Sequence, residues 1–157
     1  MLVSEIFKPA NIKINVESTD KEELFEEMVN FLIDAENLSN REDLLENLWK
    51  RERKMTTGIA PNIAIPHAHI SSIEGTLGVL GISQKGVEYD SLDGKPVYLI
   101  MLLIGNDKEP EAHLKILKSI SILSLNPDFF PTIMKCKTPK ELSDKIIEFE
   151  DISKFYQ

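Results

Sequence analysis

The chain has 157 residues, a usual length for one domain, and we expect a single domain over residues 1–157. Its formal net charge of −8 argues against nucleic acid or an anionic membrane as the main partner. The longest apolar run, residues 97–104, is too short to span a bilayer, and the first residues lack a signal-peptide pattern. A single cysteine, Cys136, excludes an intramolecular disulfide and suits the reducing cytoplasm, where we expect the protein to act without membrane insertion.

Two amphipathic helices are predicted in the first third of the chain. The first runs from a cap at Thr19 through Ala35, with apolar residues at a 3.6-residue period and acids in its first turn. The second extends to about Arg53, and Ser39 and Glu42 at its start have the spacing of a capping box.

The middle of the chain has the pattern of strands. Residues 63–65, 76–83 and 96–105 are short apolar or β-branched runs bounded by Gly, Pro and Asp. The third run is apolar at successive positions, which predicts a central strand covered on both faces. Asp93-Gly94 before it is typical of a turn.

Helical patterns return in the last third. Residues 109–125 form one predicted helix, with Pro110 near its first turn. Residues 126–135 form another, with Asn126 as cap and Pro127 at the first position, and 138–149 a third, with Thr138 and Glu141 as a capping box. Helices on either side of a strand-rich middle predict an α/β (α+β) fold, a sheet with helices on both faces.

Two of the three histidines in the chain stand just after a proline. Because proline cannot continue a sheet ladder, Pro66 is expected to stop the strand and to place His67 where the chain leaves the sheet. His69 follows two residues later. The third, His113, falls on the apolar stripe of its predicted helix, where a polar ring needs a partner.

A histidine most often has only a structural role, but two chemical hypotheses fit this pattern. In one, His67, His69 and His113 are the ligands of an open zinc site, since alternate residues of a strand point to one side. In the other, His67 is a nucleophile that accepts a phosphoryl group, with His113 and an arginine nearby to balance the charge. A lone His-x-His pair is a weak metal signal, and after Pro66 it need not be extended.

Residues 52–68, ERKMTTGIAPNIAIPHA, distinguish between these hypotheses because they resemble a known motif. They are similar to the phosphorylation site of the fructose/mannitol-type (type 2) IIA components of the bacterial phosphoenolpyruvate-dependent sugar phosphotransferase system. That motif has an acid or amide, six residues, an apolar and a small residue, two more, then apolar-Ala-apolar-Pro-His-small. Every defined position matches, and segments 92–104, 111–121 and 138–142 also resemble the family.

The resemblance implies a role for particular residues. His67 corresponds to the phosphorylated histidine, which in the family accepts the group on Nε2. His113 corresponds to the second active-site histidine at the head of a helix, and Arg51 to the arginine near the phosphate. The resemblance also implies a mixed central β-sheet flanked by helices on both faces, and it implies neither a cofactor nor a metal.

The same resemblance suggests partners. The phosphoryl donor would be the carrier HPr, charged by Enzyme I, and the acceptor a cysteine of a IIB domain that phosphorylates the sugar during transport. The alternative is the nitrogen-regulatory branch, whose members act through phosphorylation-dependent binding to regulatory proteins.

The chain departs from the family at two places. Residues 60–62, Ala-Pro-Asn, replace a more flexible Gly-Asn-Gly-like loop and should make that loop stiffer. His69 lies where relatives often carry a basic or variable residue, and we expect it to be peripheral. His113 is therefore predicted to be the working partner of His67.

Overall fold

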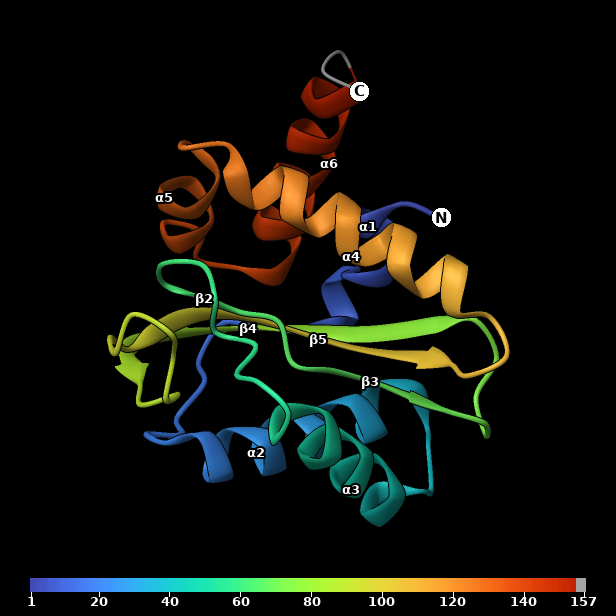
Figure 1. Cartoon of the computed structure of the whole chain (residues 1–157). Helices are drawn as coiled ribbons and strands as arrows, with labels where there is room; N and C mark the ends of the chain where they lie inside the picture. Colours follow the sequence, from blue (N-terminus) through green and yellow to red (C-terminus); the bar gives the residue numbers. More distant parts are fainter. Residues whose placement is uncertain (155–157) are drawn as a thin grey trace.

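The computed structural model describes residues 1–154, which are built around one mixed β-sheet (Figure 1). Within these residues the sheet has five strands, and β4 and β5 pair antiparallel while the other pairs are parallel. The order is β1 (Ile12–Lys13), β4 (Thr76–Val87), β5 (Val97–Asn106) and β2 (Ile63–Ala64), with β3 (His67–Ile70) also paired to β5.

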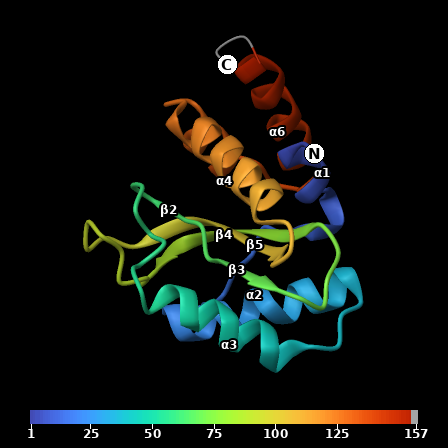
Figure 2. The same ribbon diagram turned by 45° about the vertical axis from the view of Figure 1, so that its right-hand side comes forward.

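Helices cover both faces of this sheet, as Figures 1 and 2 show. One face carries α2 (Lys21–Glu36) and α3 (Arg41–Glu52). The other carries α1 (Val3–Ile6), α4 (Pro110–Leu125), α5 (Phe129–Met134) and α6 (Pro139–Ser153), and a 3₁₀ turn, Pro9–Asn11, leads from α1 into β1. The predicted fold class is confirmed. In residues 1–154 no helix is long and apolar enough to cross a membrane.

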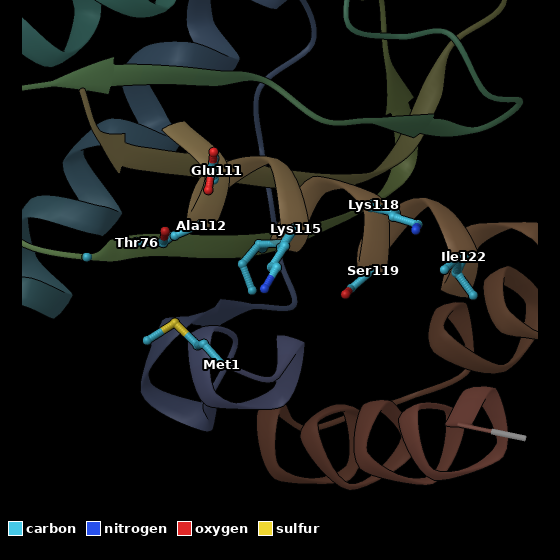
Figure 3. A pocket seen from close by; sticks show the side chains of 10 residues that line it. Met1, Thr76, Glu111, Ala112, Lys115, Lys118, Ser119 and Ile122 are labelled. Carbon is cyan, nitrogen blue, oxygen red and sulfur yellow. The ribbon is translucent and has the colours of Figure 1, made fainter. Parts of the chain in front are cut away.

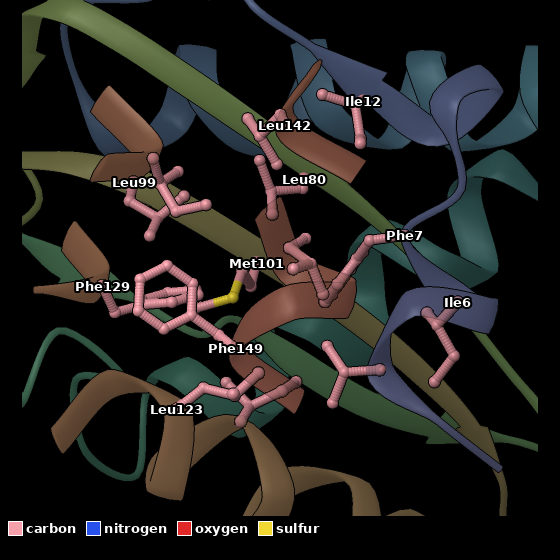
Figure 4. Packing of buried hydrophobic residues seen from close by; sticks show 14 of the residues in the cluster. Ile6, Phe7, Ile12, Leu80, Leu99, Met101, Leu123, Phe129, Leu142 and Phe149 are labelled. Atoms are coloured by element: carbon pink, nitrogen blue, oxygen red, sulfur yellow. The ribbon is translucent and has the colours of Figure 1, made fainter. Parts of the chain in front are cut away.

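The hydrophobic core is divided by the sheet into two clusters, and β5 contributes to both. Its residues at positions 99, 101 and 103 pack with the α1 and α4–α6 layer (Figure 4), whereas those at 100, 102 and 104 pack with α2 and α3. All six side chains are almost completely buried. The prediction of a central strand covered on both faces is confirmed, because alternation sends neighbouring side chains to opposite layers.

The predicted start of α2 was wrong by one residue. Asp20, not Thr19, is the N-cap, and its carboxylate accepts a hydrogen bond of 2.9 Å from the backbone N–H of Glu23. The Thr19 hydroxyl instead donates to the Glu23 side chain over 2.8 Å. Both residue types can cap a helix, so the sequence pattern alone does not distinguish between these neighbours.

The predicted capping box of α3 does not form. The helix begins at Arg41, with Asn40 at the N-cap and no side-chain hydrogen bond to the helix. The Asn40 amide donates to the hydroxyl of Ser72 over 2.7 Å. The contact ties the start of α3 to the loop after β3, so a tertiary partner replaces the local one that Ser39 and Glu42 suggested.

The start of α5 was also misplaced, while that of α6 was predicted correctly. Asn126 accepts a bond of 2.9 Å from Asp128 N–H in a turn, and α5 begins only at Phe129. Thr138 caps α6 by accepting from the N–H of Glu141 over 3.1 Å. The Glu141 carboxylate accepts from Lys137 N–H instead of completing the box with Thr138.

Pro66 interrupts the edge strand but does not end it. β2 pairs with β5 through Ile63 opposite Leu99, and β3 resumes with His67 opposite Leu103, in unchanged parallel register. The carbonyl of Pro66 accepts a bond of 3.0 Å from Leu103 N–H, so proline removes a donor and keeps an acceptor. The expectation that the chain leaves the sheet at Pro66 was therefore wrong, and the two following histidines lie on an extended strand.

Candidate functional site

The three histidines lie together between β3 and the first turn of α4. Successive residues of β3 point to opposite faces, so His67 and His69 share one face while Ala68 packs into the α2–α3 cluster. His113 approaches them from α4. The ring centroid of His113 is 5.7 Å from that of His67 and 4.2 Å from that of His69. The structure thus places His67 beside His113, and His69 closer still.

His67 is held in one tautomer by the backbone. Its Nδ1 lies 2.8 Å from the carbonyl oxygen of Ile65, and because a carbonyl can only accept, Nδ1 carries the proton. Burial lowers the pKa of His67 below its ordinary 6.5; the bond to Ile65 opposes this, and the positive charge of Arg51 lowers it further. At neutral pH the ring is uncharged and Nε2 has its lone pair available.

His113 is buried and wedged against a glycine of the neighbouring strand. The residue is 1% exposed, and a Cβ built on Gly105 would overlap its Nδ1 and lie 2.8 Å from its Cγ. Within residues 1–154 neither ring nitrogen has a hydrogen-bond partner. Burial, and then the proximity of His69 and His67, lowers the pKa of His113 to about 4, so this ring is also neutral.

Arg51 lies at the end of α3, on the side of His67. Its Nη1 donates to the carbonyl oxygen of Met55 over 2.9 Å, which holds the side chain against the turn that follows the helix. This is the hydrogen bond that the guanidinium makes within residues 1–154, and none joins it to a histidine. Its positive charge helps to lower the pKa of His67.

A buried polar network supports the turn between Arg51 and the strand. The carboxylate of Glu52 accepts from Thr57 N–H over 2.9 Å, from the Thr57 hydroxyl over 2.7 Å and from Lys21 Nζ over 2.9 Å. Because the Thr57 hydroxyl donates to Glu52, its oxygen accepts from the Tyr89 hydroxyl 2.7 Å away. Burial and the negative charge of Glu52 raise the pKa of Tyr89, which stays protonated.

Three residues that support the site were not anticipated from the sequence: two in the Glu52 network and one beside His113. Lys21 and Tyr89 are remote in sequence from Glu52, and no local pattern links them. Gly105 gave a usable signal, because a glycine inside a strand often marks a close approach by other atoms. Here the approaching group is the ring of His113.

The zinc hypothesis finds no support in this arrangement. Within residues 1–154 no group of three His, Cys, Asp or Glu side chains is placed to hold a metal ion. His113 packs its ring against the neighbouring rings, and Nδ1 of His67 is already bonded to the backbone.

The histidine cluster does not line the groove of about 910 Å³ between the N-terminus and α4 (Figure 3). That groove is bordered by Met1, by Thr76 of β4 and by the α4 side chains of Glu111, Lys115 and Ser119, among others. His113 lies on α4 but is not among these residues. The histidine cluster therefore lies outside that groove, beside the edge strand β3.

The chain is thus a single-sheet α/β protein with a backbone-oriented histidine on an edge strand, and sequence comparison gives its family. The model of the family described as "Phosphoenolpyruvate-dependent sugar phosphotransferase system, EIIA 2" matches residues 5–149. The chain belongs to this EIIA type 2 family, whose members are phosphoryl-transfer components.

Relatives of this chain fall into two groups. The fructose-specific EIIABC component of Bacillus subtilis is 32% identical to this chain over 93% of its residues. The matched region is only 23% of the length of the Bacillus protein. The nitrogen regulatory protein IIA-Ntr of Neisseria meningitidis is 27% identical in sequence. Its crystal structure matches with a TM-score of 0.84, over 92% of this chain and 98% of that one.

A third similarity concerns the fold alone. The complex of the mannitol enzyme IIA with phosphorylated enzyme IIB from Escherichia coli contains a chain that is 15% identical, with a TM-score of 0.72. The match covers 88% of this chain and 95% of that one.

Proposed function

We propose that this protein is a phosphoryl carrier in which Nε2 of His67 accepts a phosphoryl group from phospho-HPr and passes it to the cysteine of a IIB domain. The observation that carries the proposal is the bond between Nδ1 of His67 and the Ile65 carbonyl. It leaves Nε2 as the unprotonated, nucleophilic atom, on a ring that is neutral at pH 7. We further propose that residues 1–157 act as one cytoplasmic domain.

Phosphoryl transfer to His67 needs no separate acid or base. The lone pair on Nε2 of His67 forms the new N–P bond while the N–P bond of the donor phosphohistidine breaks, and the donor nitrogen recovers its electron pair. The reaction passes in line through a loose transition state with charge spread over the equatorial oxygens. Positive charge that develops on the His67 ring is stabilised by the Nδ1–H bond to the Ile65 carbonyl.

His113 and Arg51 are proposed to stabilise the phosphoryl oxygens. Nδ1 of His113 is wedged against Gly105, which leaves Nε2 as the nitrogen that donates to an oxygen of the bound group. A buried imidazole without a partner gains a hydrogen bond when the phosphoryl group arrives. Arg51 supplies a full positive charge, with N–H groups beyond the one that holds Met55.

Radiolabel transfer tests the central assignment. With phosphoenolpyruvate, Enzyme I and HPr, the protein should take up one phosphate that is labile in acid and stable in base. His67→Gln should take up none while keeping the same unfolding midpoint within a small margin, because the residue is only half-buried. Uptake by that variant at an undiminished level would show that another residue is the acceptor.

A second candidate function is regulation through the phosphorylation state, as in the nitrogen-regulatory branch. The observation in its favour is the similarity to IIA-Ntr of Neisseria meningitidis over nearly the whole of that chain. Incubating the phosphorylated protein with a panel of IIB domains separates the two. Transfer to a IIB cysteine supports the transport role, whereas no transfer, together with affinity capture that depends on phosphorylation, supports the regulatory one.

A further inference from the structure

His69 is the ring nearest to His113, and the sheet register explains why. His69 pairs with Gly105 across β3 and β5, and the His113 ring lies over that same glycine. The two ring centroids are 4.2 Å apart, at an interplanar angle of 58°. His69 itself is exposed, and its ring makes no hydrogen bond within residues 1–154. An exposed ring without a hydrogen bond therefore lies against a buried one.

The proposed role of His113 requires something at this site to move. Both of its ring nitrogens are buried, so no phosphoryl oxygen can reach them in the arrangement described. His113 is wedged against Gly105 and carried by the first turn of α4, and His67 is tied through Nδ1 to the Ile65 carbonyl. Of the three rings, only His69 is both exposed and free of a tether.

We propose that His69 is a movable cover, whose ring shields His113 in the unphosphorylated protein and rotates outward when a phosphoryl group on His67 takes its place. This inference rests on the proposed function, since it needs phosphorylation of His67. It makes His69 a positioning residue, which determines when His113 can meet the phosphoryl oxygens and does not itself take part in the transfer.

The contact between His69 and His113 should affect the phosphorylation equilibrium in a definite direction. Its contact with His113 exists only in the unphosphorylated state, so it stabilises that state alone. Removing it must shift the phosphorylation equilibrium toward the phosphorylated protein. Loss of an aromatic pair of this kind should change the equilibrium constant for phosphorylation by about two- to tenfold. A His69 ring that donated a hydrogen bond to the phosphoryl group would give the opposite sign, because its loss would weaken the phosphorylated state.

The experiment measures the equilibrium constant for phosphoryl exchange between phospho-HPr and this protein, at pH 8.5, where histidine side chains carry little charge. His69→Ala should raise the constant about two- to tenfold. The matched variant His69→Phe keeps a ring but has no donor, and should return the constant close to the wild-type value. An unchanged or lowered constant in His69→Ala overturns the cover. A wild-type protein that takes up no phosphate refutes the proposed function itself.

A second measurement follows the ring directly. In the unphosphorylated protein, NMR should show cross-relaxation between the ring protons of His69 and His113, whose centroids lie 4.2 Å apart. Phosphorylation should remove most of that signal while the backbone spectrum away from the site stays the same. A signal of undiminished strength in the phosphorylated protein would mean that His69 does not move, and would overturn the proposal.

Discussion

Replacing Gly105 by alanine perturbs the site at its most crowded point. The new methyl group would overlap Nδ1 of His113 and lie 2.8 Å from Cγ and 3.0 Å from Cβ of that residue. The three nearest atoms all belong to His113, so no other group is forced to give way first. Since the ring is buried and backed by its helix, the methyl group can be accommodated only by pushing His113 out of its place.

Two effects of Gly105→Ala follow from this geometry. Overpacking of a filled site lowers the free energy of unfolding by about 1–3 kcal/mol. Displacement of the His113 ring by about 1 Å slows phosphoryl uptake by His67 by about 10²-fold. Chemical denaturation measures the first effect, and rapid-quench labelling from phospho-HPr measures the second.

Gly75→Ala is the matched control, because it changes a glycine at the neighbouring end of β4. Gly75 has a φ of +67°, and a Cβ there meets nothing within 4 Å. Alanine should cost about 1 kcal/mol of backbone strain and leave the rate of uptake unchanged. A similar loss of rate in both variants would refute the claim that Gly105 acts through His113.

A double-mutant cycle provides the decisive number. In a His113→Ala background, Gly105→Ala no longer meets the ring atoms, and of the three nearest contacts only that of 3.0 Å with Cβ remains. We expect its stability cost to fall by at least about 1 kcal/mol relative to the wild-type background. Equal costs in the two backgrounds would show that the glycine is needed for a reason unrelated to the histidine.

Three further predictions concern ionisation and anchoring. The pKa of His113 is lowered from 6.5 to about 4 in the folded protein, so the unfolded chain binds the extra proton. Stability should fall by up to about 3 kcal/mol as the pH drops from 6.5 to 4, and urea titrations of His113→Gln should show a shallower slope. Glu52→Gln removes the counter-ion of the partly buried Lys21 and should lower the free energy of unfolding by up to about 3 kcal/mol. Adding Lys21→Met should recover part of that loss, and no recovery would contradict the pairing. Glu150→Ala removes the acceptor of the Val3 and Ser4 N–H groups, at 2.6 and 2.9 Å, and should cost about 1–2 kcal/mol. Limited proteolysis should then release the first residues without loss of phosphoryl uptake.

The helices and strands could be predicted because their signals are local. The apolar period of α2 and the uninterrupted apolar run of β5 follow from which side chains must be buried, and both elements formed where expected. Helix starts were less certain because adjacent residues compete for the same role. Thr19 and Asp20 can each cap a helix, and in the structure Asp20 does so.

The site could be predicted only in part, because a motif identifies residues and not their surroundings. The pattern ending in Pro66-His67 singled out the proposed acceptor, and the apolar stripe of its helix together with the family resemblance singled out His113. The Lys21 and Tyr89 partners of the Glu52 network come from elements far away in sequence. Neither residue type is unusual, so nothing in the chain marked them before the fold brought them together.

The direction of the His69 side chain could not be predicted, because residues after Pro66 need not be extended. If Pro66 had ended the strand, alternation would not have applied to the residues after it, and His69 would have had no fixed direction. The parallel register instead continues from Ala64 opposite Ile100 to His69 opposite Gly105. Alternation then puts His69 on the same face as His67, and the absence of a side chain at position 105 leaves room for His113 beside it. One glycine on the central strand thus determines which two histidine rings touch, and this is why changing it should disturb transfer and stability together.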